Sequence, residues 1–563
     1  MKKNIIIVLL VLLVIFCWLS AVHFMNMWKM MKWNSMHNMI MWDMKTGWHS
    51  MWHHDMWNHD IWNHDMWDGH SKNHWEVFDE NTDWLPEAKK SELVVLKNWD
   101  TYEMSAYAVK QEVWNRTVKR LSYNGMIPWP LLQVEKWAKI NLKFTNNLWI
   151  ETTLHSHWLR LENSKFDGLP LEMWGEQKAM EDGESFTYEL DFPDTGVYWY
   201  HPHIREDYTQ EMGLYGNFNV TENAYWNKID REEFLILDDF SEDDVFYKNK
   251  INKTLMWRFW NIMMINNEED YKLNLQTGES TRLFITNVAN TRTFDFKIVN
   301  SNWEVQNLKL VWWDIWRIEK EENISNQIIA PAERYIVETV FNEQGTYIIK
   351  SKNRKLWEIV VTWEKKNIIL WELRGNSDDY KNIRNNLDKY LKQDIDKKIT
   401  LTIWMKGMKW KIWGMMNMWG MNHGWEHDVT EWIEWEDEMA MMNNMSNNQM
   451  MEWKVVDEGT GKENMEINWE FKKWDFVKVE IYNDPESMHP MQHPVHFHWQ
   501  RFVVLSRDWV INNNLQWKDT TLVQNGEKIE ILVEMTNVWT WMSHCHIAEH
   551  LQSGMMLVFR VEK

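Results

Sequence analysis

Glycine and cysteine are both scarce in this chain of 563 residues. Average glycine usage of about 7% would give roughly 39 in a chain of this length, but there are only 20. The two cysteines, Cys17 and Cys545, are too few for a disulfide framework to be the source of stability. Positive charge is also in deficit, and the net charge of −22 argues against nucleic acid as a partner.

A long apolar run stands at the N-terminus, in MKKNIIIVLLVLLVIFCWLSAV. Its basic tip and the run from Ile5 to Cys17 predict an export signal over residues 1–24. The weaker apolar stretch up to Phe24 leaves an uncleaved N-terminal membrane anchor open as the alternative. The expected location is therefore the periplasm or the cell surface. If the signal is cleaved, Cys545 is the only cysteine of the mature chain.

Two tracts are rich in methionine and histidine. Residues 25–99 form a low-complexity tract and linker, with a repeat of His-Asp-Met/Ile-Trp-Asn between His53 and His70. This tract has neither a helical nor a strand period, so we expect it to be disordered without metal. The second tract runs from Trp404 to Asp428 and is interpreted as a linker or a surface insertion.

The rest of the chain shows the pattern of short strands. Apolar residues alternate in AKINLKF, TRLFITN, DFVKVEIYN and EKIEILVEMTN, which is typical of half-buried antiparallel strands. Many such strands predict an all-β protein of β-sandwich domains. Glu135–Asn147 resembles Lys472–Asp484, so the same unit is expected early and late in the chain. A short helix is expected within the charged stretch 372–398.

Four histidine motifs carry the chemistry: LHSHW, WYHPHIRED, HPVHFHW and SHCHIAEHLQSGMM. His-x-His on a strand places both imidazoles on one face. Cys545 with two histidines and a weak axial methionine would be a blue-copper site, for which His493, His550 and Met555 are available. His544 and His546 flank Cys545 and point to the opposite face of its strand, toward a different metal about a dozen ångströms away. Eight imidazoles are then left, enough for three further copper ions.

From about residue 100 to 563 the chain resembles the multicopper oxidase family, including the bacterial laccase-like and copper-resistance members. The resemblance implies three cupredoxin-like β-sandwich (Greek-key) domains. We expect these at 100–225, 226–370 and 431–563, with a linker carrying the Met-rich insertion at 371–430. It also implies four copper ions. The type 1 ligands would be His493, Cys545, His550 and Met555. The type 2 ligands would be His155 and His496. The type 3 ligands would be His157, His201, His203, His498, His544 and His546.

The activity that the resemblance implies is an oxidase reaction with dioxygen as acceptor. A reducing substrate would give up four electrons singly at the type 1 site, and Cys545 would pass them to the trinuclear cluster, where dioxygen becomes water. Asp167, in KFDGLP, matches the acid near the cluster of relatives, and proton relay competes there with a simple Asp-Gly turn. Many relatives have a second acid just after the type 1 histidine, where this chain has Leu551. Glu549 lies nearby.

Tryptophan is as abundant as glycine is scarce, with 44 residues. Where the family has glycine, this chain repeatedly has tryptophan, as at Trp129, Trp137, Trp158, Trp257, Trp260, Trp312, Trp313, Trp316, Trp474, Trp499 and Trp509. Trp199, Trp435, Trp517 and Trp541 stand where the family has tryptophan. Either indoles occupy these turns at a cost of roughly 1–3 kcal/mol each, or the source reads UGA as glycine and the gene was translated with UGA as tryptophan. The second hypothesis is favoured and predicts crowding at Trp158 and Trp499.

The expected electron donor is Cu(I), with Fe(II) as a further candidate. Thioethers and imidazoles suit Cu(I), so the two Met-rich tracts indicate copper capture in copper tolerance. The competing interpretation of these tracts is a solvated linker. The alternative functions are a laccase-like oxidase of phenols and a copper-sequestering cupredoxin protein without turnover.

Overall fold

The computed structural model describes residues 82–113, 116–157, 159, 164–222, 228–241, 259–362, 372–405, 433–436, 451–487 and 489–563. All of them belong to one compact unit, Lys72–Lys563. The N-terminal apolar run and the His-Asp repeat lie outside the described residues, as does the second Met-rich tract beyond Met405. In the part of the chain that is described, no helix is long and apolar enough to cross a membrane.

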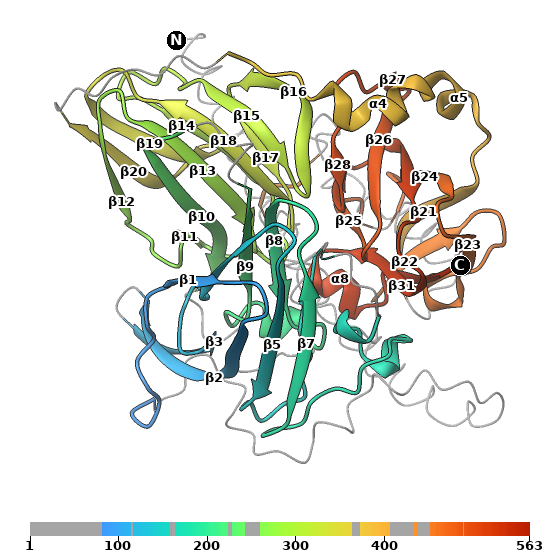
Figure 1. Ribbon diagram of the computed structural model, residues 1–563, viewed down its shortest axis with the longest axis horizontal. Coiled ribbons are helices and arrows are strands. Elements are labelled where there is room, and N and C mark those ends of the chain that lie inside the picture. Colours follow the sequence, from blue (N-terminus) through green and yellow to red (C-terminus); the bar gives the residue numbers. More distant parts are fainter. Residues whose placement is uncertain are drawn as a thin grey trace, which may run out of the picture. The chain divides into compact units, whose positions relative to one another are not determined.

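Strands dominate and form three successive pairs of sheets (Figure 1). The first pair spans residues 93–221. One sheet contains, in spatial order, β1 (Leu93–Leu96), β4 (Leu131–Glu135), β9 (Gly216–Thr221), β8 (Gly196–His201) and β6 (His155–Ser156). The other contains β3 (Arg116–Tyr123), β2 (Thr101–Val113), β5 (Lys139–Asn146) and β7 (Ser185–Asp191).

The second pair of sheets spans residues 231–362 and encloses one apolar core drawn from both sheets. The first sheet contains β11 (Ile262–Ile265), β10 (Arg231–Phe240), β13 (Ser280–Asn287), β18 (Arg334–Val340), β15 (Leu308–Trp313) and β16 (Trp316–Ile324). The second contains β12 (Lys272–Gln276), β20 (Arg354–Thr362), β19 (Gly345–Ser351), β14 (Phe294–Val299) and β17 (Gln327–Ile329).

The third pair of sheets spans residues 397–562. One sheet contains β22 (Met451–Asp457), β21 (Lys397–Met405), β24 (Phe476–Asn483), β30 (Lys528–Glu534), β26 (Arg501–Arg507) and β27 (Val510–Ile511), with β28 (Trp517–Lys518) paired to β26. The other contains β23 (Asn468–Lys472), β32 (Met556–Glu562), β31 (Trp539–Cys545), β25 (His493–Phe497) and β29 (Thr520–Val523). The predicted all-β, cupredoxin-like fold class is confirmed.

Two strands lie in stretches that were predicted as linkers. β1 falls within 25–99, and β21 falls within 371–430. Ile399, Leu401 and Ile403 of β21 are buried in alternation, and the strand pairs with β22 and β24. Met405 of β21 stands opposite Met451 of β22, so the Met-rich tract is inserted between two neighbouring strands of the third pair of sheets.

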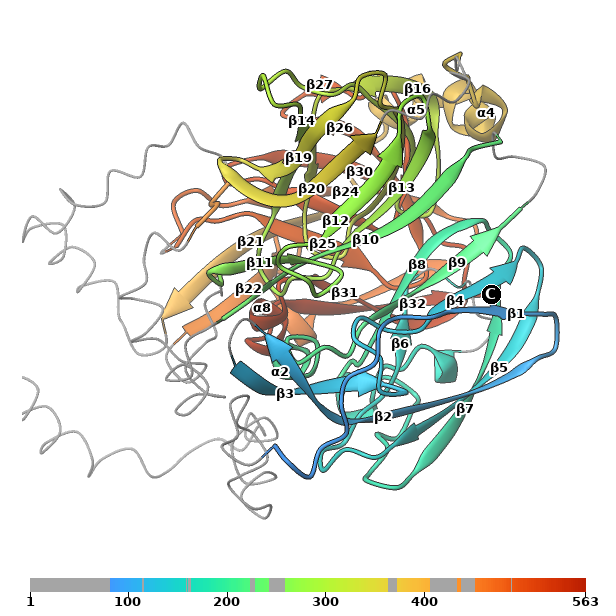
Figure 2. The ribbon, with the colours of Figure 1, turned by 90° about the vertical axis from the view of Figure 1, so that its left-hand side faces the viewer.

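Among the described residues, helices are few and short. The expected helix in 372–398 is present as two segments, α4 (Ser377–Asn385) and α5 (Leu387–Lys392). Two further helices begin within histidine motifs, namely α2 (Glu206–Thr209) and α8 (Ala548–Gln552). They lie against each other, as Figure 2 shows. Single 3-10 turns occur at Ser164–Phe166, Leu171–Met173 and Asn464–Glu466.

The internal repeat seen in the sequence corresponds to equivalent strands. β5 and β24 each pair with one antiparallel and one parallel neighbour, and each ends in an asparagine. Asn146 donates to the backbone oxygens of Ile150 and Met180, and Asn483 donates to those of Met491 and Val523. Asn287 does the same at the end of β13. In each of the three sandwiches, a buried asparagine amide therefore donates hydrogen bonds to backbone oxygens at the end of the corresponding strand.

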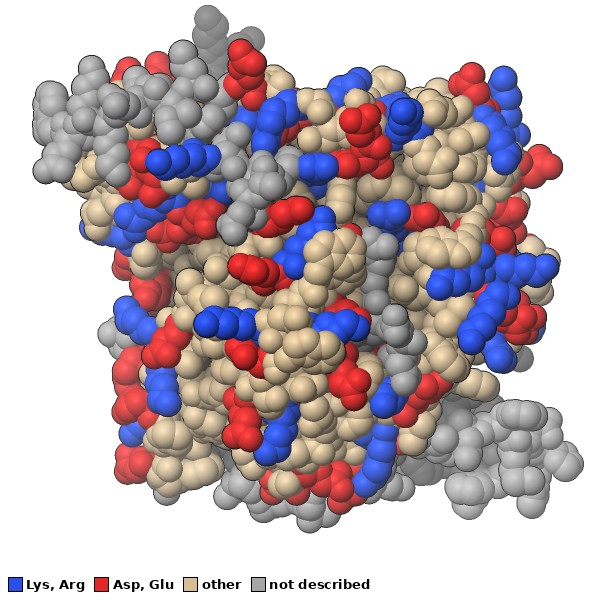
Figure 3. Space-filling model, viewed as in Figure 1, with Lys and Arg blue, Asp and Glu red and all other residues tan. Residues whose placement is uncertain are grey.

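Charged side chains of both signs share the face of the molecule that Figure 3 shows. On the face shown in Figure 3, Lys and Arg alternate with Asp and Glu rather than gathering by sign. Many of them form exposed pairs, such as Lys143 with Glu103 and Lys355 with Glu358. Such pairs add little to stability.

Candidate metal centre

Strand pairing brings the four histidine motifs together in two groups of two. In the first pair of sheets, β6 and β8 are antiparallel and His155 stands opposite His201. In the third, β25 and β31 are antiparallel and His496 stands opposite His544. The alternation of side chains along each strand then sends both histidines of a motif to one face.

Eight buried imidazoles from these motifs converge on one another. The Nε2 atoms of His157 and His201 are 3.3 Å apart, and those of His157 and His546 are 3.2 Å apart. The Nε2 atoms of His498 and His544 are 3.1 Å apart. All eight predicted cluster histidines take part, since the ligand groups also include His155, His203 and His496.

The other ring nitrogen of most of these histidines is hydrogen-bonded to an oxygen. Nδ1 lies 2.7–2.9 Å from an oxygen acceptor in His155, His201, His496, His498 and His544. Four of these acceptors are backbone carbonyls, which can only accept, so Nδ1 carries the proton there and the Nε2 lone pair is left for a ligand. The Nε2 atoms of His155, His203 and His496 have no hydrogen-bond partner among the described residues, although they are buried.

Burial favours the neutral form of most of the cluster imidazoles. It lowers the pKa of seven of them, to about 3 for His546 and about 4 for His498. The proximity of other imidazoles lowers the pKa of most of them further, as it does in His496. Neutral imidazole is the form that binds metal. The remaining members of this set are His157, His201, His203 and His544.

Asp167 joins two histidines that belong to different domains. Its Oδ1 lies 2.9 Å from Nδ1 of His155, and its Oδ2 lies 2.9 Å from Nδ1 of His498. The indole Nε1 of Trp499 also donates to it. Burial raises the pKa of this carboxyl, but the two histidines outweigh burial and hold the pKa below its usual range. Asp167 is therefore an ionised acceptor that orients two imidazoles.

The turn Asp167–Gly168 fits tightly under His155. Gly168 has φ +77°, and a Cβ atom there would lie 2.2 Å from the backbone oxygen of Leu154. Only glycine can adopt this backbone conformation in that space. Asp167 and Gly168 therefore form a tight turn, and this same turn places the Asp167 carboxylate beside the cluster.

A second group contains one sulfur and two imidazoles. Sγ of Cys545 lies 3.6 Å from Nδ1 of His493 and 3.5 Å from Nδ1 of His550, and these two nitrogens are 3.2 Å apart. Met555 is buried, and its backbone oxygen accepts from the Cys545 N–H. Burial raises the pKa of the Cys545 thiol and lowers that of His493 to about 3. The indole of Trp453 stacks on His550 at 3.7 Å.

The two groups are joined by one short stretch of chain. Cys545 belongs to the sulfur group, whereas its neighbours His544 and His546 reach into the cluster. The opposite directions of adjacent side chains on β31 produce this division.

The position of the expected second acid is apolar. Leu551 is fully buried in α8 and packs in a cluster with Leu169, Met173 and Met542. Glu549, also buried, accepts from Asn290 Nδ2 and from the Thr291 hydroxyl, both at 3.2 Å. Glu549 therefore ties α8 to the second pair of sheets.

Sequence reasoning missed two buried carboxylates beside the cluster. Glu206 of α2 lies 3.3 Å from Nδ1 of His203, and burial raises its pKa. Asp519 supplies the backbone oxygen that accepts from His496. Glu206 stands three residues after His203 within WYHPHIRED, so this spacing could have marked it. Nothing in WKDT marks the proximity of Asp519 to His496, which lies 23 residues away.

Comparison with known proteins agrees with this arrangement. Family profiles described as multicopper oxidase match residues 107–224 and 434–563. The chain belongs to the multicopper oxidase family. It is an oxidoreductase that uses copper, dioxygen and a reducing substrate. The matched segments are those that carry the four histidine motifs.

Relatives of this oxidase cover most of its length. It is 24% identical to a multicopper oxidase of Staphylococcus aureus over 83% of this chain and 89% of that protein. Among solved structures, the oxidase resembles a Campylobacter jejuni multicopper oxidase described as a metallo-oxidase, with TM-score 0.62, 20% identity and 87% and 98% coverage. It also resembles McoA of Aquifex aeolicus, with TM-score 0.63, 19% identity and 85% and 100% coverage.

The side chains present fit copper. A metal ion that binds two imidazole nitrogens at about 2.0 Å, as zinc does at a tetrahedral angle, holds them roughly 3.3 Å apart, and the Nε2 atoms here are separated by 3.1–3.3 Å. The orphaned Nε2 atoms of three buried histidines require a partner that the protein does not supply. One thiol with two imidazoles and a nearby methionine is the donor set of a blue-copper site.

Proposed function

We propose that this protein is an exported metallo-oxidase that oxidises Cu(I) and reduces dioxygen to water, and that it serves copper tolerance. Four Cu(I) ions, one dioxygen and four protons would give four Cu(II) ions and two water molecules. Periplasmic or cell-surface location, with a cleaved signal or a membrane anchor, belongs to this proposal. The alternatives are oxidation of phenols and sequestration of copper without turnover.

One observation carries the oxidase part of the proposal. Cys545 and its two neighbours place the sulfur group and the histidine cluster on one continuous stretch of backbone. The proposed ligands are His493, Cys545, His550 and Met555 for a type 1 copper, His155 and His496 for a type 2 copper, and the remaining six cluster histidines for a type 3 pair. Bound copper would supply the one-electron chemistry and the binding of dioxygen.

The residues around the cluster then have distinct tasks. Hydrogen bonds from Nδ1 fix ring orientations, and burial favours the neutral form of most of the imidazoles, as in His496. Asp167 holds one imidazole from each of two domains in place. Asp167 is the proposed proton relay, as the family resemblance implies, and it contacts the ring N–H groups of two proposed ligands. Leu551 offers no acid at the second expected position, whereas the buried carboxyls of Glu206 and Asp519 lie beside other cluster histidines.

The preference for Cu(I) rests on the methionines. Met405, Met408, Met415, Met416, Met418 and Met421 belong to the tract inserted between β21 and β22, in the domain that carries the proposed type 1 site. Thioethers are soft ligands that favour Cu(I) over Fe(II). The Campylobacter jejuni neighbour described as a metallo-oxidase is consistent with a metal substrate.

Oxygen consumption separates the three functions. The fully copper-loaded protein is given Cu(I), Fe(II) or a phenol at equal concentration, and we expect the highest kcat/KM with Cu(I). Replacing the six methionines by leucine should raise KM for Cu(I) and leave oxidation of the phenol unchanged. Replacing Asn417 and Asn422 by serine in the same tract is the matched control and should change neither. Turnover with the phenol alone would favour the laccase-like function, and no turnover with any donor would leave sequestration.

A further inference from the structure

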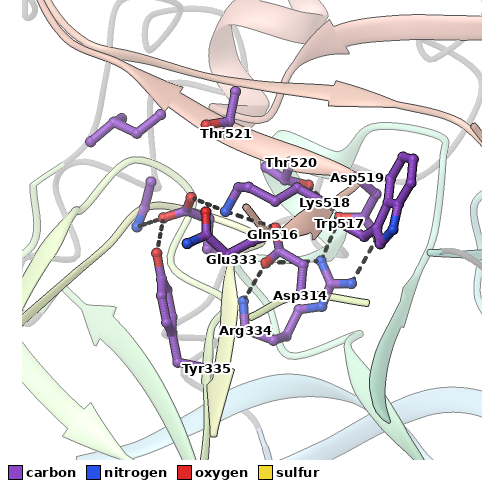
Figure 4. Close-up of polar contacts among 12 residues, drawn as sticks. Asp314, Glu333, Arg334, Tyr335, Gln516, Trp517, Lys518, Asp519, Thr520 and Thr521 are labelled. Carbon is purple, nitrogen blue, oxygen red and sulfur yellow. Dashed lines mark hydrogen bonds and ion pairs between the residues drawn. The ribbon is translucent and has the colours of Figure 1, made fainter. Parts of the chain in front are cut away.

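A buried charge network connects the second and third pairs of sheets (Figure 4). It reaches the histidine cluster through Asp519. The guanidinium of Arg334, on β18, donates from two nitrogens to the two carboxylate oxygens of Asp519, at 2.7 and 2.8 Å. Both side chains are about 1% exposed or less. The planar guanidinium of arginine can donate two parallel hydrogen bonds to one carboxylate, whereas the ammonium group of lysine cannot.

Arg334 contacts all three sandwiches. Its Nε donates to the backbone oxygen of Val197 on β8, at 3.2 Å, and one terminal nitrogen donates to the backbone oxygen of Ala332 in its own domain. β8 ends at His201, a cluster histidine. A single side chain thus fixes a strand of the first domain and a carboxylate of the third.

Asp519 in turn contacts the cluster. Its backbone oxygen accepts from Nδ1 of His496 at 2.9 Å, and the hydroxyl of Thr520 lies 3.1 Å from the same nitrogen. That hydroxyl donates to the Asp519 carboxylate at 2.9 Å. Another oxygen of the carboxylate lies 3.9 Å from Nδ1 of His157, and the rings of His157 and His496 stack at 3.9 Å.

The surrounding charges leave Asp519 dependent on Arg334. Lys518 is already shared by Asp314 and Glu333, at 3.0 and 3.1 Å. Two buried cations therefore face three buried carboxylates, and only Arg334 among these cations contacts Asp519. A buried carboxylate without its cation is strongly disfavoured, and its segment would rearrange to find water or another donor.

We propose that Arg334 is a positioning residue for the cluster. It holds Asp519, and residues 519 and 520 hold the ring of His496, on which the ring of His157 stacks. The middle domain supplies no histidine to the cluster, yet through Arg334 it would set whether the two ligand-bearing domains meet in a geometry that binds copper. This inference rests on the proposed copper-binding function.

The test compares two buried arginines of the middle domain. Arg334→Gln removes the paired hydrogen bonds to Asp519, and Arg334→Lys restores charge without that pair. Arg282→Gln is the matched control, because Arg282 is equally buried and donates to Glu338 at 2.6 and 3.1 Å, away from the histidines. Copper per chain, blue absorbance, and the paramagnetic resonance signal of the non-blue copper are measured together with the melting temperature.

We expect Arg334→Gln to keep the blue absorbance and to lose at least half of the copper outside the type 1 site. Arg334→Lys should lose less, and Arg282→Gln should lower the melting temperature and keep all copper. An Arg334→Gln protein with full copper and an unchanged resonance signal would overturn the inference. So would equal copper loss in Arg282→Gln. A parent protein that binds no copper at the histidines would instead overturn the proposed function.

A second observation, independent of the cluster, concerns the tryptophans. Eight of the 17 described non-glycine residues with positive φ are tryptophan, namely Trp99, Trp137, Trp174, Trp303, Trp474, Trp499, Trp509 and Trp539. Asparagine and aspartate tolerate this conformation, whereas a bulky side chain there is an outlier. Glycine is the residue that adopts it without steric cost.

The positions of these tryptophans are those of turn glycines. Asp508 and Trp509 have φ of 43° and 69° and connect β26 to β27, which is a two-residue hairpin turn for which Asp-Gly is preferred. Trp137 and Trp474 precede the equivalent strands β5 and β24, with φ of 70° and 75°. Seven of the eight are exposed, Trp509 at 73%.

Trp499 is the exception, since it is fully buried with φ of 55° directly after His498. Its indole enters the space around Asp167, which already receives two histidines. By contrast Trp199, Trp517 and Trp541 are buried and have ordinary strand backbones. Trp158 and Trp257 lie outside the described residues, and Trp129, Trp260, Trp312, Trp313 and Trp316 are not among those with positive φ.

We infer that the natural chain carries glycine at the eight positive-φ positions, because its source translates UGA as glycine. Codons decide this first: UGA is expected at all eight positions and UGG at Trp199, Trp517 and Trp541. Peptide masses of the protein from its source should show glycine at the eight positions. UGG at Trp499 or Trp509, or peptides with tryptophan there, would overturn the inference.

Discussion

His157 and His546 are 389 residues apart in the chain, and their Nε2 atoms lie 3.2 Å apart. One belongs to the first pair of sheets and the other follows β31 of the last. The histidine cluster therefore forms only when the first and third domains are in contact. An assembled cluster indicates that both domains are folded and correctly placed.

Replacing Cys545 by serine should abolish turnover with every electron donor. Serine cannot supply the thiolate of a blue-copper site, whereas the eight cluster histidines are untouched. The blue absorbance should disappear and the remaining copper should stay. The control is Cys17→Ser, the other cysteine of the chain, which should leave absorbance and turnover unchanged. A blue Cys545→Ser protein would contradict the assignment.

Replacing Asp167 by asparagine should weaken copper binding in the cluster. An amide can accept from one of the two histidines, but its NH2 group cannot accept from the other. Loss of such an orienting partner lowers metal affinity by about 10- to 100-fold. Copper content after dialysis against a chelator measures this. Asp191→Asn, at a partly exposed carboxylate paired with Lys139, is the control, and equal retention in both variants would refute the orienting role.

Replacing Trp509 by glycine should stabilise the protein expressed with tryptophan. Relief of the left-handed backbone is worth about 1–2 kcal/mol, and the exposed indole loses little burial. Trp541→Gly should do the opposite, by about 3–5 kcal/mol, because that indole is fully buried. Urea unfolding of the two variants and the parent gives the comparison. Destabilisation by Trp509→Gly would count against a glycine position.

Asp238 makes stability depend on pH. It is buried on β10, and burial raises its pKa from 3.8 to about 7, although Arg120 opposes the shift. Between these values the folded chain keeps a proton that the unfolded chain releases, so stability falls as the pH rises from about 4 to 7. Asp238→Asn removes this loss and keeps an acceptor for the hydroxyl of Tyr215. The free energy of unfolding of the variant, relative to that of the parent, should therefore rise by roughly 2 kcal/mol between pH 5 and pH 8.

The pH test has its own control. Asp182→Asn, at an exposed position, undergoes the same unfolding measurements as the control for replacing an aspartate by asparagine. If Asp238→Asn differed from the parent equally at pH 5 and pH 8, the raised pKa would be refuted.

The strands and the ligand motifs could be predicted from the sequence because both depend on spacing within a few residues. Ile140, Leu142 and Phe144 alternate and are buried on β5. The same alternation in Ile399, Leu401 and Ile403 was overlooked, since the Met-rich tract directly after it set the expected boundary.

The remainder depends on contacts between distant segments. Arg334 stands in RYIVETV, an ordinary strand sequence with no sign of the carboxylate 185 residues away that it holds. The role of Asp519 is equally hidden, because its backbone oxygen rather than its side chain receives His496. Residue spacing cannot show which strands of separate domains will face each other.

The pairing of Met405 with Met451 has a consequence for how such oxidases diversify. Because the two ends of the inserted tract are fixed opposite each other on neighbouring strands, its closure cost grows only slowly with length. Segments of different length and composition can therefore be exchanged between β21 and β22 at little cost to their pairing. On the role proposed above for this tract, such an exchange would change the electron donor while the proposed copper ligands stay the same.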